Sequence, residues 1–271
     1  GRPLFHFQNA RIKSELMSDE KKLAIVKVPA VTLGFWVIKI FATTLGETGG
    51  DALSMTFNLG YLVSTGIFAM IFIAAVIAQV QARKFYPWLY WTTIVATTTV
   101  GTTAADFVTR DLGIGYSGGS TILLLAVIGS LATWRFTTGS VAISTVSTAK
   151  SEIFYWLTIM FSQTLGTALG DWFADTANLG YLGAAAVFGS ALVLLYAIYR
   201  HTRISKTGIF WAAFIITRPL GAVVGDFLDK PITSGGLALS RIEASLALVI
   251  LMTLLIHLLP QHSASDKTFA H

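Results

Sequence analysis

Four aspartates recur at one position in four similar apolar segments, where a carboxylate could bind a cation or carry a proton. Each aspartate lies fifteen residues after a tryptophan, and a glycine lies ten residues after the same tryptophan. This W-x9-G-x4-D pattern indicates a four-fold internal repeat, and an acid in a long apolar segment is rare without a function. The tryptophans are Trp36, Trp91, Trp156 and Trp211, and the aspartates are Asp51, Asp106, Asp171 and Asp226.

Threonines share a helix face with these aspartates. On a helix, the positions 8, 11 and 15 residues after each tryptophan lie on one side, because steps of three and four residues return to the same face. The face predicts a path lined by oxygen atoms, with carboxylates near one end. Its threonines are Thr44, Thr99, Thr102, Thr164 and Thr167.

Three charged residues break the four-fold pattern. Glu47 occurs in the first repeat only, Lys39 lies eight residues before it, and Arg218 lies in the fourth repeat beside Pro219. Because buried acids and bases need partners, Glu47 is either the structural partner of Arg218 or Lys39, or a ligand for a substrate. The aspartates have a structural alternative too, since an aspartate at a helix end can bond the amides of the next turn.

A site built of carboxylate and hydroxyl oxygens suits hard cations such as Mg²⁺, Ca²⁺ or Mn²⁺, and clustered acids can also take up protons. The sequence has no cysteine, which excludes thiolate metal sites and disulfides. We therefore predict a bound divalent cation and no other cofactor. The predicted metal ligands are Glu47, Asp51, Asp106, Asp171 and Asp226, and Lys39 and Arg218 lie along the predicted transport path.

The elements that carry these residues have the length of membrane spans. The chain is 54% hydrophobic and 12% charged, and apolar stretches of about 20 residues, enough to cross a bilayer, recur along it. We predict helices, because a backbone in lipid must satisfy its own hydrogen bonds. The predicted spans are approximately 30–52, 60–81, 87–108, 119–136, 152–173, 178–199, 208–228 and 237–259.

The repeats form two halves, in which corresponding residues are 120 positions apart. The first helix of each repeat carries the polar residues, so we expect it to line the centre while the second faces lipid. The sequence predicts a basic cytoplasmic tail over 1–27, one integral membrane domain over 28–260 and a second tail over 261–271. Within that domain the first half covers 28–136, a linker covers 137–151 and the second half covers 152–260.

Lysine and arginine are concentrated on one side of the predicted spans. The net charge is +5, and most basic residues lie in the amino-terminal tail and in the loops after even-numbered spans. The positive-inside rule then places both termini in the cytoplasm, in a bacterial inner membrane. The predicted partner is the lipid bilayer rather than nucleic acid, and the sequence is compatible with a homo-oligomer. The four tryptophans are predicted to be anchors at the membrane interface.

The quadruple W-x9-G-x4-D pattern resembles a bacterial membrane-protein family of four tandem two-helix repeats, each marked by a tryptophan, whose function is unknown. The resemblance covers about residues 28–259. It implies an all-α polytopic membrane protein with eight transmembrane helices in four hairpin repeats. It implies no activity.

Three functions remain open from the residues alone. The predicted one is a secondary transporter that moves a divalent metal cation and is coupled to protons. The second is a membrane-embedded enzyme for a lipid or isoprenoid substrate, because paired carboxylates can act as acid and base or hold Mg²⁺. The third is a non-transporting sensor or scaffold in which the aspartates brace the hairpins. A central cavity would favour the first function, and a packed centre the third.

Overall fold

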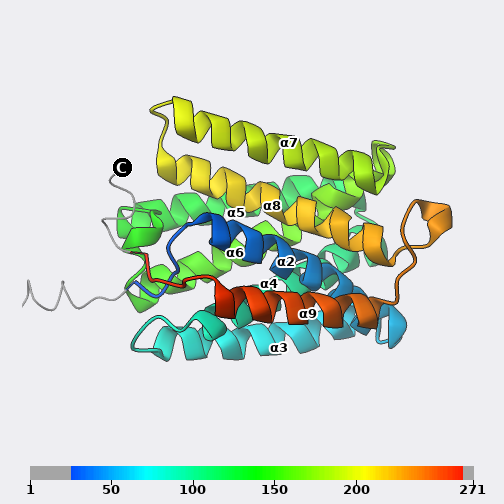
Figure 1. Cartoon of the computed structure of the whole chain (residues 1–271), viewed down its shortest axis with the longest axis horizontal. Helices are drawn as coiled ribbons and strands as arrows, with labels where there is room; N and C mark the ends of the chain where they lie inside the picture. Colours follow the sequence, from blue (N-terminus) through cyan, green and yellow to red (C-terminus); the bar gives the residue numbers. More distant parts are fainter. Residues whose placement is uncertain (1–25, 265–271) are drawn as a thin grey trace, which may run out of the picture.

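Eight long α-helices lie side by side in the computed structural model, which describes residues 26–264 (Figure 1). The prediction of eight helices is confirmed, and each end differs from its predicted position by only a few residues. Most of the predicted tails, 1–27 and 261–271, lies outside the described residues. The helices are α2 (Leu33–Asp51), α3 (Gly60–Gln81), α4 (Pro87–Asp106), α5 (Gly115–Thr138), α6 (Ala149–Asp171), α7 (Gly180–His201), α8 (Lys206–Asp229) and α9 (Arg241–Leu258).

Three of the four polar helices end in a π-helical turn immediately after their aspartate. These turns are η1 (Ala52–Thr56), η2 (Phe107–Asp111) and η4 (Trp172–Thr176). Single π-helical turns in helices are frequent at functional sites. The fourth polar helix, α8, instead continues past Asp226 as an α-helix, and Pro219 does not interrupt it.

The first helices of the four repeats form a closed ring at the centre of the bundle. Helix α2 packs against α4, α4 against α6, α6 against α8, and α8 against α2. This arrangement confirms that the first helix of each repeat is the inner one.

Each outer helix packs on the inner helix of the next repeat. Helix α3 packs against α4, α5 against α6 and α7 against α8, and α9 returns to α2. A repeat is therefore not a self-contained hairpin, because each repeat covers its neighbour and the last covers the first.

Glycines at the ring contacts allow the inner helices to approach closely. The glycine ten residues after each tryptophan faces a side chain of the following inner helix. A Cβ atom at Gly221 would lie 2.6 Å from Thr43 Cβ, and one at Gly101 would lie 2.9 Å from both the backbone and the Cβ of Gln163. Neither contact can be relieved by a side-chain rotation, because backbone and Cβ atoms of a helix do not move with the side-chain torsions.

Replacing Gly101 with alanine should therefore destabilise the protein by about 1–3 kcal/mol through overpacking. Thermal unfolding in detergent would measure this. Gly129→Ala in α5 is the matched control, because nothing lies within 4 Å of a Cβ added there, and alanine favours the helix. Equal losses from both substitutions would contradict close packing at Gly101.

Both ends of the described chain lie at the same end of the bundle (Figure 1). Pro29 and Ser263 form an isolated antiparallel bridge there. Lys27, assigned to the tail from the sequence, is buried, and its Nζ lies 2.7 Å from Glu152 Oε1 on α6. The segments before α2 and after α9 are thus held against the bundle by these contacts.

The linker between the two halves is shorter than 137–151, because α5 extends through Thr138 and α6 begins at Ala149. It contains a short 3-10 helix, η3 (Ile143–Thr145), and it buries Ile143 and Val146. Its Val141 carbonyl accepts a hydrogen bond from Trp211 Nε1 at 3.0 Å. The linker therefore packs on the ring.

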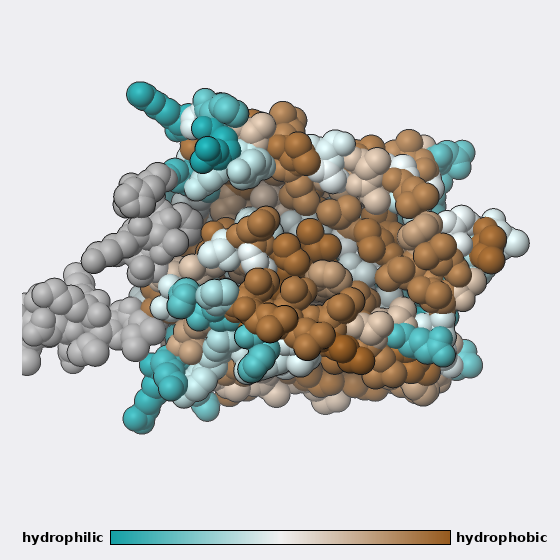
Figure 2. All heavy atoms as spheres, in the orientation of Figure 1, coloured by the Kyte–Doolittle hydropathy of each residue, from teal (hydrophilic) through white to brown (hydrophobic). Residues whose placement is uncertain are grey.

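The outside of the bundle is apolar across its middle. Five helices in residues 26–264 are long and apolar enough to cross a membrane, namely α3, α5, α7, α8 and α9. Figure 2 shows a broad hydrophobic area on the visible face, with hydrophilic residues gathered toward the two ends. An apolar surface of this extent requires lipid or a protein partner to cover it.

Candidate functional site

Aromatic side chains close the ring at the end where the chain termini lie. The aromatic residue before each tryptophan contacts the tryptophan of the next repeat, with ring centroids 5.5 to 6.1 Å apart. The hydroxyls of Tyr90 and Tyr155 are also hydrogen-bonded, 2.6 Å apart. We call these eight residues the aromatic belt: Phe35, Trp36, Tyr90, Trp91, Tyr155, Trp156, Phe210 and Trp211.

The prediction that the repeated tryptophans are interface anchors is wrong for three of them. Trp91, Trp156 and Trp211 are buried inside the bundle, and Trp36 is partly buried. The aromatic residue before each tryptophan was the available signal, since an aromatic pair repeated on every inner helix can close a ring.

Lys39 lies one helical turn beyond the belt and is fully buried. Its ammonium donates to the Phe214 carbonyl at 2.9 Å and lies 3.9 Å from the centroid of the Phe214 ring. In the described part of the chain it forms no ion pair with a carboxylate, so the alternative pairing with Glu47 is not formed.

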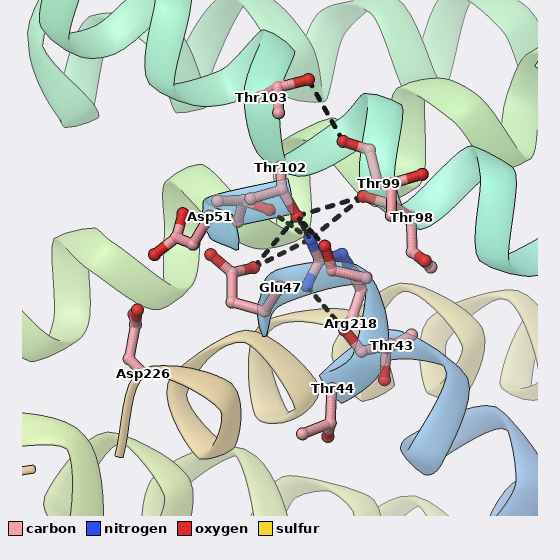
Figure 3. Close-up of polar contacts among 12 residues, drawn as sticks. Thr43, Thr44, Glu47, Asp51, Thr98, Thr99, Thr102, Thr103, Arg218 and Asp226 are labelled. Atoms are coloured by element: carbon pink, nitrogen blue, oxygen red, sulfur yellow. Dashed lines mark hydrogen bonds and ion pairs between the residues drawn. The ribbon is translucent and has the colours of Figure 1, made fainter. Parts of the chain in front are cut away.

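Arg218 crosses the centre of the ring and contacts all three other inner helices (Figure 3). Its Nη2 lies 3.0 Å from Glu47 Oε2 on α2 and donates to Thr102 Oγ1 on α4 and Thr167 Oγ1 on α6, each at 2.6 Å. Its Nη1 donates to the Thr43 carbonyl at 3.4 Å. The structural pairing of Glu47 with Arg218 is therefore formed, and we call this group the crossbar.

The remaining threonines of the predicted path do not join the crossbar. The hydroxyls of Thr44, Thr99 and Thr164 each donate at 3.0 Å to a carbonyl of their own helix, four residues earlier. This local bond is common for threonine in helices, and it leaves these hydroxyls without a role between helices.

Two basic side chains join the four aspartates in pairs. Arg110 Nε lies 2.9 Å from Asp106 Oδ1, and its Nη2 lies 3.0 Å from Asp171 Oδ2. We call this group the arginine bridge. Burial alone would lower the pKa of Arg110, but the carboxylates of Asp106 and Asp171 outweigh burial and hold the pKa above its usual value. The guanidinium is therefore charged.

Lys230 forms the corresponding lysine bridge. Its Nζ contacts Asp51 Oδ2 and lies 3.1 Å from Asp226 Oδ1. Burial opposes its charge, but Asp226 and Asp51 raise the pKa of the ammonium well above its usual value. Across residues 26–264, none of the four aspartates accepts a hydrogen bond from an amide of the following turn. The hydrogen bonds expected from the hairpin-brace alternative are therefore not formed.

Sequence reasoning missed both bridging bases. The available signal was their spacing, because Lys230 lies 120 residues after Arg110, which is the separation of the two halves. Each base also lies four residues after an aspartate, a spacing at which helical side chains meet.

Glu47, Asp51 and Asp226 bring their carboxylates together in what we call the acidic trio. One oxygen from each residue lies within 4.8 Å of the other two, and all three residues are buried. Figure 3 shows the three carboxylates turned toward one another. Asp51 Oδ1 has no hydrogen-bond partner. Of the five predicted metal ligands, these three are brought together, and the other two lie in the arginine bridge.

A cavity of about 730 Å³ opens at the aspartate end of the bundle. Asp226, Lys230, Arg110 and Arg241 line it together with exposed loop residues such as Ser234. The cavity therefore reaches the acidic trio at Asp226, whereas the crossbar and the aromatic belt close the other end of the ring.

The fold and the site define a bundle of four cyclically packed helical repeats around a polar axis. The chain belongs to the family described as Repeat of Unknown Function (DUF347), which matches residues 34–85, 89–140, 154–205 and 209–263. The prediction of four tandem repeats is thereby confirmed. Neither the curated proteins nor the solved structures contain a match to the chain.

Proposed function

We propose that the protein is a secondary membrane transporter of a divalent cation, with the acidic trio as its cargo site. One observation carries the proposal: three buried carboxylates lie within 4.8 Å of one another, next to a cavity that Asp226 lines. Carboxylate oxygens are the ligands that Mg²⁺, Ca²⁺ and Mn²⁺ prefer.

The charge balance of the site supports a doubly charged cargo. The acidic trio, the crossbar, both bridges and the Arg241–Asp229 pair contain six carboxylates and four bases. When every group is charged, two negative charges are in excess. One divalent cation or two protons would neutralise them, which provides a physical basis for exchange of the cation against protons.

In this proposal the bundle crosses a bacterial inner membrane. The apolar outer surface and the five long apolar helices support a bilayer as the surroundings. The outer helices cover α2, α4 and α6, so the threonines of those helices need not face lipid. Because both chain ends lie at one end of the bundle, the positive-inside rule puts that end in the cytoplasm.

Transport requires alternating access to the acidic trio. The aspartate end is open in this structure, while the crossbar and the belt close the cytoplasmic end. A cation bound to Glu47 weakens the attraction between Glu47 and Arg218, because the carboxylate is then neutralised by the metal. Release toward the cytoplasm then requires Arg218 to leave the axis and the belt to part.

Cation flux into liposomes tests the proposal. The reconstituted protein should take up Mn²⁺, and Asp51→Asn or Asp226→Asn should reduce uptake at least ten-fold, about 1.4 kcal/mol of binding energy. Asp106→Asn is the matched control, since it removes an equally buried carboxylate outside the acidic trio and should retain most of the uptake. A folded protein that moves none of Mn²⁺, Mg²⁺ and Ca²⁺ would refute transport.

A cation sensor is the second candidate function. The crossbar favours it, because Arg218 ties together all four inner helices and fills the centre of the ring. A sensor would bind Mn²⁺ at the acidic trio, change conformation and carry no flux, so binding and flux measured together separate the two functions.

A further inference from the structure

The two bridges occupy equivalent positions but differ in chemistry. Each base lies four residues after one aspartate and reaches the aspartate of the neighbouring repeat. In the arginine bridge, two different nitrogens of Arg110 hold the two carboxylates. In the lysine bridge, one ammonium serves both carboxylates.

This difference determines which of the two bases can leave its aspartates. A guanidinium is planar, and its fork fixes two acceptors at once, whereas an ammonium is a compact, strongly hydrated charge on a flexible stem. The ammonium of Lys230 lies between Asp51 and Asp226, where a cation bound to the same oxygens would lie. Its side chain is 13% exposed and lines the cavity, so water is within its reach.

Within residues 26–264, a third carboxylate joins the two aspartates of the lysine bridge in a group that could hold a metal ion, and none joins those of the arginine bridge. Glu47 completes the acidic trio, whereas the residue 120 positions later, Thr167, carries a hydroxyl. Three other charged residues lie at the trio. Arg218 Nη2 lies 3.0 Å from Glu47 Oε2, and Arg241 Nε lies 3.9 Å from Asp51 Oδ2 and 3.0 Å from Asp229 Oδ2. The lysine bridge thus has the ligand set for a divalent cation, and the arginine bridge does not.

The backbone of Lys230 is fixed while its side chain faces the cavity. The Lys230 carbonyl accepts a hydrogen bond from Ala238 N at 2.9 Å. It also lies so close to Gly236 that a Cβ atom there would collide with it. The loop therefore fixes the backbone of Lys230, and only the side chain has to move for the ammonium to leave the carboxylates.

We propose that Lys230 is an internal, displaceable counter-ion that occupies the acidic trio until a divalent cation enters from the cavity, whereas Arg110 is a permanent clamp. This inference rests on the proposed cation site. Displacement exchanges one ammonium charge for two metal charges, so the charge at the trio rises by only one unit. Without Lys230, Asp51 and Asp226 would lose the base that pairs with both of them whenever the cargo is absent.

Titration calorimetry with Mn²⁺ on the purified full chain tests the displacement. Lys230→Gln removes the competing ammonium and should tighten Mn²⁺ binding at least ten-fold. Lys230→Arg installs a guanidinium that leaves less readily and should weaken binding at least ten-fold. Arg110→Gln removes the same charge from the equivalent position and controls for a general electrostatic effect, so it should tighten binding far less than Lys230→Gln.

Different results would contradict the displacement of Lys230 and the transport of a cation. If Lys230→Gln binds Mn²⁺ no more tightly than the wild type, or no more tightly than Arg110→Gln, displacement is overturned while wild-type flux still supports transport. If Lys230→Gln does not fold, the Mn²⁺ affinity of Lys230→Arg is the test. An affinity equal to that of the wild type overturns displacement. Absence of cation flux in the wild type refutes the proposed function itself.

Discussion

Arg218→Met should lower the free energy of unfolding by about 3–5 kcal/mol, because it leaves a buried carboxylate without its counter-charge. Arg218 is fully buried, and it holds Glu47 at 3.0 Å and the hydroxyls of Thr102 and Thr167 at 2.6 Å. Methionine fills much of the same volume, so the loss reports charge and hydrogen bonds more than packing. Chemical or thermal unfolding in detergent measures the effect.

A double-mutant cycle separates the ion pair from the rest of the crossbar. Glu47→Gln alone leaves the guanidinium of Arg218 buried without an acid and should also destabilise the protein. Glu47→Gln combined with Arg218→Met removes both charges and should recover much of the loss, since a buried pair replaced as a whole costs little. A double variant no more stable than Arg218→Met would show that the ion pair is not the cause.

The helices and their inner and outer roles could be predicted from the sequence, because both depend on local patterns. Apolar length sets the spans, and the polar face repeated after each tryptophan marks the inner helix. The partner of each outer helix could not be predicted in this way. A two-helix repeat suggests that its own two helices pack together, yet α3 packs on α4 of the next repeat and α9 returns to α2. Ring closure is a property of all four repeats together.

The predicted candidate site omitted the two bases that join its aspartates in pairs. Glu47, Asp51 and Asp226 do meet, but Arg110 and Lys230 are assigned to loops by hydropathy alone. Their side chains fold back onto the helix ends, where the aspartates attract them. For the threonines, the sequence predicted more contacts between helices than the structure has. A shared face does not decide whether a hydroxyl bonds its own helix or a neighbouring one.

The aromatic belt shows why a repeated tryptophan near a helix end is ambiguous. Tryptophan is enriched at membrane interfaces, but it also has the largest side chain available to a core. On α4 the two environments occur one turn apart. Trp88 is 50% exposed, and Trp91 is fully buried. Trp91 Nε1 donates to Gln261 Oε1 at 3.1 Å, and its ring lies 5.5 Å from that of Phe35.

Trp91→Ala should therefore destabilise the protein by about 3–5 kcal/mol, the usual loss for a large aromatic removed from a core. Trp88→Ala, with the same chemical change at an exposed position of the same helix, should change stability by about 0.5 kcal/mol or less. Unfolding of both variants in one detergent gives the comparison. If both substitutions cost the same, the repeated tryptophans serve as surface anchors, and the end of the ring near the chain termini lacks the closure on which the proposed alternating access depends.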